Sequence, residues 1–455
     1  MKPSRSHSLA APSKTVAFFA PALTAIEAFV SSRPRCSPRA LLALVGLASF
    51  AASNAATLTV STPAELQAAL VSASSGDIVL VRAGVYVTAQ PLVVGDGVTV
   101  LGEGSMRLAD GLPTGFDPIG ETVVQASPAL VGDLVTLGHG TILSCLSLRD
   151  APGRAGGNVL VVSSRSPADI VSATILECEI FNPNMPGIGP QGPVGRALAV
   201  ITRNLNFANP PPPHEQSAMT VRMTRTLVRT VQSNPAFCSG VWAHNFASHC
   251  TIKLTLTDNV LGGGIELIGG NSRPEAVAGS SVDLDSRQNL YRSDTVVPQP
   301  IGWTFIGGTI APVPGVPGPS TNNRVQVLSV DDRIEGFQTA IFATGARRPS
   351  LVAPPVQGNQ VLLSVHGAQL SSLTRDLMLR GAESFAGPVG VDTNNSVHVV
   401  LSNSVGSGVR ANLYTHGTEQ GAGNQLEIVG SSRSFAHSNE QILPAPDAEF
   451  FSSSR

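Results

Sequence analysis

Apolar and polar residues alternate in many short stretches of this chain, and the clearest one runs from Thr321 to Arg348 as TNNRVQVLSVDDRIEGFQTAIFATGARR. Its first half has the period-2 pattern typical of a strand with one buried face. The inward positions of that strand are Val325, Val327 and Ser329. A polar break at 331–333 leads to a second short apolar stretch at 339–343. The pattern therefore predicts a strand, a tight polar turn, a second strand and a looser loop.

The same unit recurs along the chain. Long alternating stretches begin at Thr141, Thr174, Thr220, Thr251, Ser281, Arg324, Gln360, Ser396 and Gln425. Short apolar stretches lie between them and begin at Val159, Ala197, Gly240, Gly264, Ile301, Ala340, Leu377 and Asn412. The long stretches start roughly 30 to 45 residues apart, a period typical of solenoids. Repeated strands without helices predict a parallel β-helix, in which each coil pairs only with its neighbours.

The segment before the first coil predicts a cap for the end of the solenoid. Thr62 is followed by Pro63, and Glu65 stands three residues after Thr62, which is the pattern of a capped helix start. The apolar face of this short helix would consist of Leu66, Ala69 and Leu70. A helix at this place would protect the first coil from pairing with other strands.

Residues 33–55 have the pattern of an export signal. Three arginines precede an apolar run at 40–52, which is too short to span a bilayer comfortably, and small residues follow at 53–55. The alternative is a buried helix of a cytosolic protein. We expect export, a secreted, periplasmic or cell-surface location, and no transmembrane segment in the mature chain. The expected domains are an export signal region at 1–55, the β-helix at 56–437 and a C-terminal tail at 438–455.

Three motifs after the apolar run carry a family resemblance: TPAELQAAL, SGDIVLVRAGVY and VTVLGEG. Together with the coils that follow, they resemble secreted right-handed parallel β-helix proteins of the pectin-lyase-like superfamily, over residues 57–435. Within it the chain is most similar to an uncharacterised bacterial family, with SVDDRIEGF and NLYRSD as local hallmarks. The resemblance implies an all-β fold, a single-stranded right-handed parallel β-helix with a short N-terminal capping helix. The superfamily includes lyases, glycoside hydrolases, esterases, epimerases and non-catalytic adhesins, so fold alone does not give function.

Charge and aromatic content narrow the range of partners. The chain of 455 residues has 29 basic and 31 acidic side chains. This near-neutral balance gives no support for binding to nucleic acid or to an anionic membrane surface. Aromatic residues make up only 5%, which argues against rows of stacking platforms.

The cysteines offer a test of coil register. Cys145 and Cys178 lie in similar stretches, TILSCLSL and TILECEIF, and are expected at the same position of neighbouring coils. Neighbouring strands lie about 4.8 Å apart, which is within the range of a disulfide. The sequence allows either a disulfide or a reduced, buried pair at these two positions. Cys238 and Cys250 are a second possible pair. The sequence contains no CxxC or His-x3-His spacing, so we expect no zinc site.

Outward positions of three consecutive strands predict a polar column, with Arg222, Lys253 and Asp283 side by side and Asp285 diagonal to Lys253. The column is similar to the sites of polysaccharide lyases of this fold, where a base removes the proton next to a uronate carboxylate. Lys253 would be the base, kept neutral by the neighbouring Arg222, which would bind the carboxylate. The two aspartates would hold Ca2+ or orient Lys253; no other cofactor is expected. The alternative is a surface salt-bridge ladder without catalytic function.

Two further groups are candidates for substrate binding. Asp331, Asp332 and Arg333 crowd one turn, where the two aspartates would form the acid pair of a glycoside hydrolase or simply cap the turn. His214 and Glu215 precede the Arg222 strand and would reach over the column as accessory acids. The lone histidines that we expect to be structural are His244, His249, His366 and His416.

Two functional hypotheses follow. In the first, a monomeric exported β-helix binds or acts on polysaccharide, by lyase-like cleavage of a uronate-containing glycan or, second, by hydrolysis. In the second, the protein is a non-catalytic cell-surface or envelope module for binding or structure. The partner in both cases is a polysaccharide or surface glycan.

Overall fold

The computed structural model describes residues 55–154, 156–184, 188–189, 192–193, 195–202, 214–230, 240–272, 275–293, 301–310, 318–348, 354–373, 375–384, 392–404, 406, 409–411, 424–430 and 449–454. The chain divides into two units, Met1–Ala55 and Ala56–Arg455, and the fold below is that of the second unit. The predicted export signal, except for Ala55, lies outside the described residues. Within the described ranges, no helix is long and apolar enough to cross a membrane.

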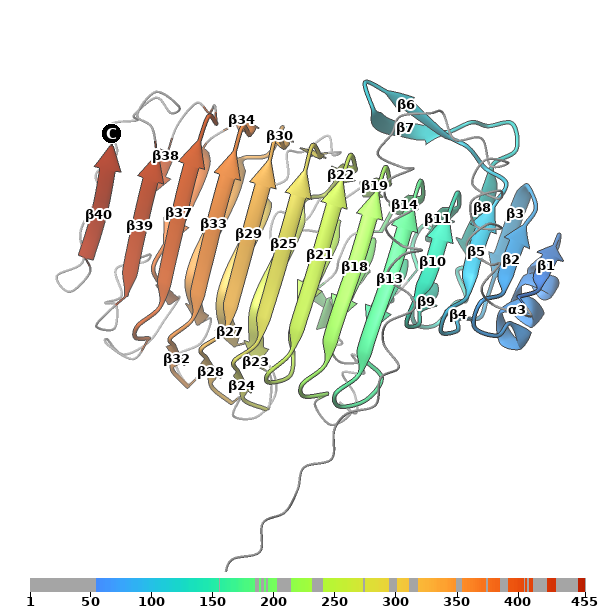
Figure 1. Ribbon diagram of the computed structural model, residues 1–455, viewed down its shortest axis with the longest axis horizontal. Coiled ribbons are helices and arrows are strands. Elements are labelled where there is room, and N and C mark those ends of the chain that lie inside the picture. The colour runs from blue at the N-terminus through green and yellow to red at the C-terminus, as the bar shows by residue number, and fades with distance from the viewer. Residues whose placement is uncertain are drawn as a thin grey trace, which may run out of the picture. The chain divides into compact units, whose positions relative to one another are not determined.

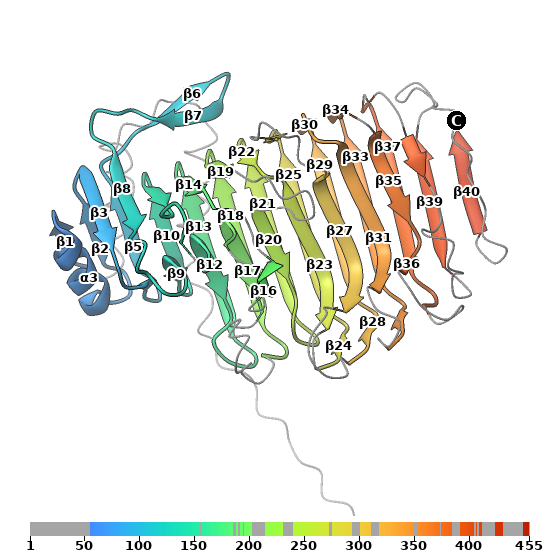
Figure 2. The same ribbon diagram turned by 180° about the vertical axis from the view of Figure 1, so that it is seen from behind.

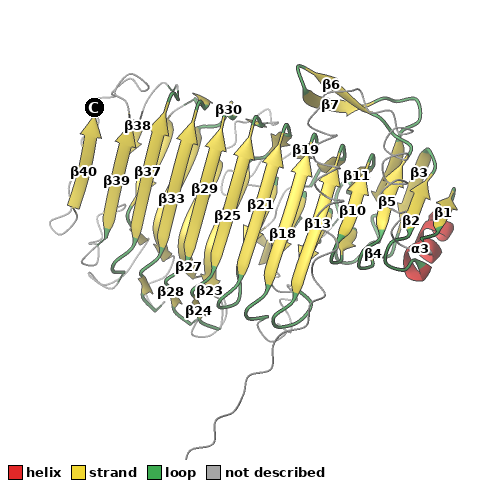
Figure 3. Cartoon of the chain, in the orientation of Figure 1, coloured by secondary structure: helices red, strands yellow, loops and turns green. Residues whose placement is uncertain are grey.

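The second unit is a parallel β-helix, as the sequence predicts. From β2 to β37 each coil passes through three parallel sheets, A, B and C, and then returns to sheet A one strand further along (Figure 1). One such coil runs through β13 (Ile170–Leu176), β14 (Glu179–Asn182) and β17 (Leu198–Ile201) and returns at β18 (Ala218–Thr224). Strands therefore pair between successive coils, which is the pattern of a solenoid. Figure 3 shows that strands account for almost all of the regular structure.

The strands of the three sheets follow the order of the coils. Sheet A consists of β1 (Thr57–Val60), β2 (Ile78–Val81), β5 (Thr99–Gly102), β10 (Thr141–Ser144), β13, β18, β21 (Thr251–Thr257), β25 (Ser281–Arg287), β29 (Arg324–Val330), β33 (Gln360–His366), β37 (Ser396–Ser402), β39 (Gln425–Gly430) and β40 (Glu449–Ser454). Sheet B consists of β3 (Gly84–Thr88), β8 (Thr122–Ala126), β11 (Ser147–Arg149), β14, β19 (Leu227–Thr230), β22 (Val260–Gly262), β26 (Leu290–Arg292), β30 (Arg333–Glu335) and β34 (Gln369–Ser371). Sheet C consists of β4 (Leu92–Val94), β9 (Val135–Leu137), β12 (Leu160–Ser163), β17, β20 (Val241–His244), β23 (Ile265–Ser272), β27 (Ile301–Ile310), β31 (Thr339–Arg348), β35 (Arg375–Arg380), β36 (Glu383–Ser384) and β38 (Val409–Ala411). Figure 2 shows the strands of sheet C from β12 to β35 in coil order.

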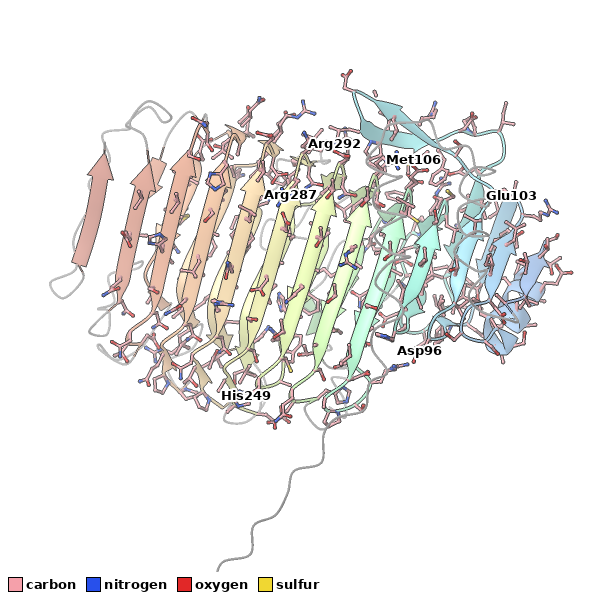
Figure 4. All side chains as sticks on the ribbon, in the orientation of Figure 1. Asp96, Glu103, Met106, His249, Arg287 and Arg292 are labelled. Carbon is pink, nitrogen blue, oxygen red and sulfur yellow. The ribbon has the colours of Figure 1, made fainter. Side chains whose placement is uncertain are left out.

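Smaller elements lie at the corners. A short parallel sheet joins β24 (Val277–Ala278), β28 (Ser320–Thr321) and β32 (Val356–Gln357), and β15 (Ile188–Gly189) pairs with β16 (Gly192–Pro193). The hairpin of β6 (Met106–Ala109) and β7 (Leu112–Phe116) leaves the stack and packs on sheet B, where Met106 and Phe116 contact Leu227 and Val260. Figure 4 labels Met106 on this hairpin.

Sheet B is the part of the fold that the sequence did not predict. We expected two strands and a tight polar turn in each coil, but the turn at 331–333 opens a third strand, β30. Strands of sheet B have as few as three residues and one inward side chain, such as Leu261 in β22 or Ile334 in β30. One apolar residue makes no period-2 pattern, so these strands look like turns in the sequence.

The core fills the space between the sheets. In β29 the residues Val325, Val327 and Ser329 are buried, while Arg324 and Gln326 are exposed, as the alternation predicts. The expected cap is α3 (Pro63–Ser72). Its N-cap forms a reciprocal capping box, in which the Glu65 backbone N–H donates to Thr62 Oγ1 (3.2 Å) and the Thr62 N–H donates to the Glu65 carboxylate (3.1 Å). The predicted face of Leu66, Ala69 and Leu70 joins the core.

The cysteines do not occupy matching positions. Cys145 stands at the turn after β10 and aligns with Glu177, while Cys178 lies one residue further on, opposite Leu146. The expected match is therefore wrong by one residue, because the similar letters TILSC and TILEC come from different registers of the coil. Both residues are buried thiols that no disulfide joins. Burial raises the pKa of the Cys178 thiol well above its ordinary value.

The remaining predictions concern a pair between Cys238 and Cys250 and a C-terminal tail. Cys238 lies outside the described residues, and Cys250 is a buried thiol whose pKa burial raises to about 11. The segment 438–455 is expected to be a tail, but its residues 449–454 form β40, which pairs in parallel with β39 and continues sheet A.

Candidate functional site

The predicted polar column lies on the outward face of sheet A, but in a different register. Lys253 in β21 stands beside Thr220 in β18 and Asp283 in β25, whereas Arg222 stands beside Thr255. The prediction that Arg222 lies directly beside Lys253 is therefore wrong by two residues. We placed the start of the strand at Thr220, but β18 begins at Ala218 because Met219 already points into the core.

The two aspartates of the column are engaged by arginines. Asp285 accepts two hydrogen bonds from Arg287, at 2.7 and 3.1 Å, on the same strand. Asp283 lies 3.7 Å from the guanidinium of Arg324 in the next coil. Lys253 is exposed and forms no ion pair with any residue in the described ranges. Figure 4 shows Arg287 near one end of its strand.

This arrangement does not fit Ca2+. The ion takes six to eight oxygen ligands, whereas Asp283 and Asp285 supply two carboxylates that arginines already pair. Among the described residues, no group of three or more His, Cys, Asp or Glu side chains is placed to hold a metal. The column is thus a mixed-charge surface, and binding of Ca2+ to it stays a prediction.

His214 does not reach over this column. The residue is buried at the corner between sheets C and A, with Nδ1 at 3.1 Å from Ser164 Oγ and 3.0 Å from the Ser164 carbonyl. Ser217 Oγ in turn donates to the His214 carbonyl at 2.9 Å. Glu215 is exposed. His214 therefore fixes the corner of the coil, and only Glu215 is open to solvent.

Asp331, Asp332 and Arg333 also differ in environment. Asp331 is exposed, with a φ of 57° at the turn, and Arg333 is half-buried. Asp332 is fully buried and accepts a backbone hydrogen bond from Asn289 (2.8 Å) and a side-chain one from Ser329 (2.7 Å). Burial raises the pKa of Asp332 to about 6 despite these bonds. The positions match the turn-capping alternative and not a pair of acids facing a substrate.

A second polar cluster, which the sequence did not predict, lies on the outward face of sheet C. Trp242 and His244 point outward from β20, and Glu266 points outward from β23. Trp242 Nε1 donates to Glu266 Oε1 at 3.1 Å, and His244 Nε2 lies 2.9 Å from the same oxygen. The guanidinium of Arg196 lies 5.5 Å from the centre of the Trp242 ring. We call these four residues the sheet C cluster.

The sheet C cluster is buried although it faces away from the core. The side chains of His244 and Glu266 are only 2% and 11% exposed. Burial alone would raise the pKa of Glu266, but the hydrogen bond and charge of His244, the charge of Arg196 and the Trp242 N–H lower it to about 2. The carboxylate therefore stays ionised over the whole physiological range.

The geometry of His244 decides what this cluster can do. Nε2 faces Glu266, and Nδ1 lies 3.1 Å from the amide of Asn271. Both ring nitrogens are engaged inside the protein, so neither faces a bound substrate as a general base must. The cluster thus joins three successive coils of sheet C, and in this structure it is not arranged for proton transfer to a ligand.

A pattern in the sequence could have revealed this cluster. Sheet C strands are apolar on both faces, and the outward position that His244 occupies is isoleucine in neighbouring coils: Ile201, Ile268 and Ile306. A tryptophan, a histidine and a glutamate at such positions stand out once the register is known. We predicted a structural role for His244 but did not connect it with Glu266, because the two are 22 positions apart in sequence.

Comparisons with known proteins give limited similarity. No protein-family model matches the chain, and no curated protein matches it. Among solved structures, the chain is similar to the periplasmic alginate epimerase AlgG, at 10% identity, a TM-score of 0.29 and coverage of 82% of this chain and 83% of the other. A mutant of the same epimerase gives 9% identity, a TM-score of 0.32 and 83% coverage of each chain. A mutant of the PL6 family alginate lyase AlyGC gives 10% identity, a TM-score of 0.17 and coverage of 84% and 78%.

Proposed function

We propose that this chain is an exported protein that binds a polysaccharide along the outward face of sheet A. The observation that carries the proposal is that polar side chains on this face, half-buried or exposed, recur from coil to coil in straight columns. One column contains Ser172, Thr220, Lys253, Asp283 and Gln326, which are register partners of one another.

A ligand that suits such a surface is itself a repeating chain. Neighbouring strands are about 4.8 Å apart, so hydrogen-bonding groups recur at that spacing along the stack. A linear polysaccharide offers hydroxyl groups at a regular repeat and can contact several coils at once. Several weak contacts then add up to useful affinity without a deep pocket.

Binding is favoured over cleavage by the state of the charged residues. Asp283 and Asp285 are paired with Arg324 and Arg287, so they are poorly placed to orient Lys253 as a base. The second candidate function, lyase-like cleavage of a uronate-containing glycan, is favoured by one observation: Lys253 is exposed and pairs with no described residue.

The test uses the purified protein with a panel of uronate-containing and neutral polysaccharides. Co-sedimentation measures binding, the ultraviolet absorbance of unsaturated uronate measures elimination, and reducing ends measure hydrolysis. We expect binding without either product, and weaker binding for Lys253→Ala. The control is Arg82→Ala, which removes an exposed cation in the connection between β2 and β3. Unsaturated product that disappears in Lys253→Ala would establish the lyase instead, and no binding at all would overturn the proposal.

A further inference from the structure

The corner between sheets A and B contains a continuous ladder of hydrogen bonds. In the coils of β18, β21, β25 and β29 a residue with positive φ is followed by a buried polar residue at this corner. The backbone N–H of each such residue donates to the side-chain oxygen of the next coil: Thr226 to Asn259 (2.9 Å), Asn259 to Asn289 (2.9 Å) and Asn289 to Asp332 (2.8 Å). We call these four residues the corner ladder.

The asparagines of the corner ladder use both ends of the amide. Each side-chain oxygen accepts a hydrogen bond from a backbone N–H of the preceding coil. Each Nδ2 donates to a backbone carbonyl of that same coil: Asn259 to Met223 at 3.0 Å, and Asn289 to Leu256 at 2.9 Å. Asn289 Nδ2 also lies 2.9 Å from Ser286 Oγ, to which it donates. An amide therefore satisfies this corner completely, as buried polar groups require.

Asp332 occupies the same place in the ladder with a carboxyl group. Its Oδ1 accepts from the Asn289 backbone (2.8 Å) and from Asn289 Nδ2 (3.2 Å), as an asparagine oxygen would. Its Oδ2 accepts a hydrogen bond from Ser329 Oγ at 2.7 Å. In the preceding coil the direction is the opposite, since Ser286 Oγ accepts from Asn289 Nδ2. An ionised carboxylate has no hydrogen to give at the position where the asparagines donate.

The ladder also ends at Asp332. The corresponding residue of the next coil is Ala368, whose N–H donates instead to Ser404 Oγ at 3.2 Å. The last rung of the ladder thus places the backbone and side-chain amides of Asn289 on one fully buried carboxyl group. At the corner between sheets C and A, an equivalent ladder is neutral throughout and consists of Ser280, Asn323, Asn359, Asn395 and Asn424.

We propose that Asp332 makes the corner ladder a pH-sensitive joint of the solenoid, closed when its carboxyl group is protonated and weakened when it is ionised. A protonated carboxyl group has the same shape as the asparagine amide and one hydrogen to donate. The ionised group leaves a buried charge that no cation pairs among the described residues.

The surroundings of Asp332 keep this titration separate from that of other groups. From sheet B the buried phenol of Tyr291 faces it, and burial raises the pKa of that phenol, with the nearby Asp332 charge adding to the effect. Asp331 and Arg333 flank it in sequence, the first exposed and the second half-buried. His366 precedes the turn of the next coil and bonds to Ser402. Tyr291 therefore stays neutral near pH 6, and Asp331 lies at the surface.

The sign of the effect follows from the direction of the shift. The pKa of Asp332 rises from its ordinary value of 3.8 to about 6 in the folded chain. The folded state then binds the proton more tightly than the unfolded state, so this group stabilises the fold at low pH. That stability is lost as the pH rises from about 4 through about 6, which raises the unfolding constant roughly a hundredfold.

The test compares the wild-type chain with Asp332→Asn in urea unfolding between pH 4.5 and 7.5. We expect the variant to be more resistant at pH 7.5 and nearly unchanged at pH 4.5, because the amide reproduces the protonated form. Asp133, Glu177 and Asp392 are other carboxyl groups whose pKa values burial raises, so only the difference between the two proteins isolates Asp332.

The matched control is Asp331→Asn, which makes the same chemical change one residue away at an exposed site. It should leave the pH profile unchanged. If Asp332→Asn does not fold, hydrogen exchange of the Asn289 amide in the wild-type protein gives the same answer, since exchange should accelerate above about pH 6 beyond its intrinsic pH dependence. Equal profiles for wild type and Asp332→Asn, or exchange that follows only the intrinsic dependence, would overturn the proposal.

Discussion

Two outward faces of the solenoid each hold a histidine paired with a glutamate, and the two pairs differ in burial. On sheet C, His244 and Glu266 have side chains 2% and 11% exposed. On sheet A, His398 and Glu427 lie 2.6 Å apart, with side chains 37% and 47% exposed. Each pair joins an imidazole nitrogen to a carboxylate oxygen, and on sheet C the carboxylate also accepts from Trp242 and faces Arg196.

The difference separates architecture from recognition. A buried ion pair costs desolvation energy that its mutual attraction must offset, while a solvated pair costs and contributes little. The sheet C cluster therefore has large consequences for folding and offers no nitrogen of His244 to a ligand. Sheet A carries charges that water and a polymer can both reach, so its consequences should appear in binding.

The largest effect is expected on sheet C from Glu266→Gln. This change leaves His244 and Arg196 without the carboxylate that faces them, and breaking a buried pair in this way costs about 3–5 kcal/mol of unfolding free energy. Urea unfolding at pH 7 measures the loss. The control is Glu427→Gln in the exposed pair; similar losses in both variants would contradict the comparison.

Acid should also weaken the sheet C cluster. The pKa of Glu266 is lowered from 4.5 to about 2, so its stabilising contribution is present above about pH 4.5 and is lost as the pH falls towards 2. The melting temperature should fall steeply in the wild type as the pH is lowered from 5 to 2, and less steeply in Glu266→Gln. Parallel profiles would show that other carboxylates dominate acid unfolding.

The next effect concerns binding and is confined to sheet A. Lys253→Ala should weaken polysaccharide binding about tenfold, equivalent to about 1.4 kcal/mol, because one exposed cation is lost from the column. Its unfolding free energy should change by less than about 0.5 kcal/mol, as for surface substitutions generally. Trp242→Phe is the opposite case, since it removes the N–H that Glu266 accepts and should reduce stability without changing binding.

The same contrast explains what the sequence could predict. Alternation such as that of Val325 and Val327 predicts a strand with one buried face. The fold and the start of β29 therefore follow directly from the sequence. The polar column depended on the start of β18, and an error of two residues moved Arg222 away from Lys253. The sheet C cluster depends on contacts between coils, and no local pattern records that Glu266 faces His244. Periodicity thus gives the elements, whereas pairing between elements needs the register.

The last variant makes both members of the buried pair apolar. Neighbouring coils place Ile201 and Ile268 in the column of His244, so this face accepts aliphatic side chains. The double variant His244→Ile with Glu266→Leu should therefore lose less stability than Glu266→Gln, because the imidazole and the carboxylate that face each other are removed together. Together with the single variants His244→Ile and Glu266→Leu it forms a double-mutant cycle, in which urea unfolding measures the free energy of each protein. The control is the corresponding cycle on the exposed pair, His398 and Glu427. A coupling energy several times larger for the buried pair than for the exposed one is expected, since water screens the exposed pair. Equal coupling in the two cycles would mean that the outward face of sheet C is as wet as that of sheet A, and the distinction between an architectural face and a recognition face would then fail.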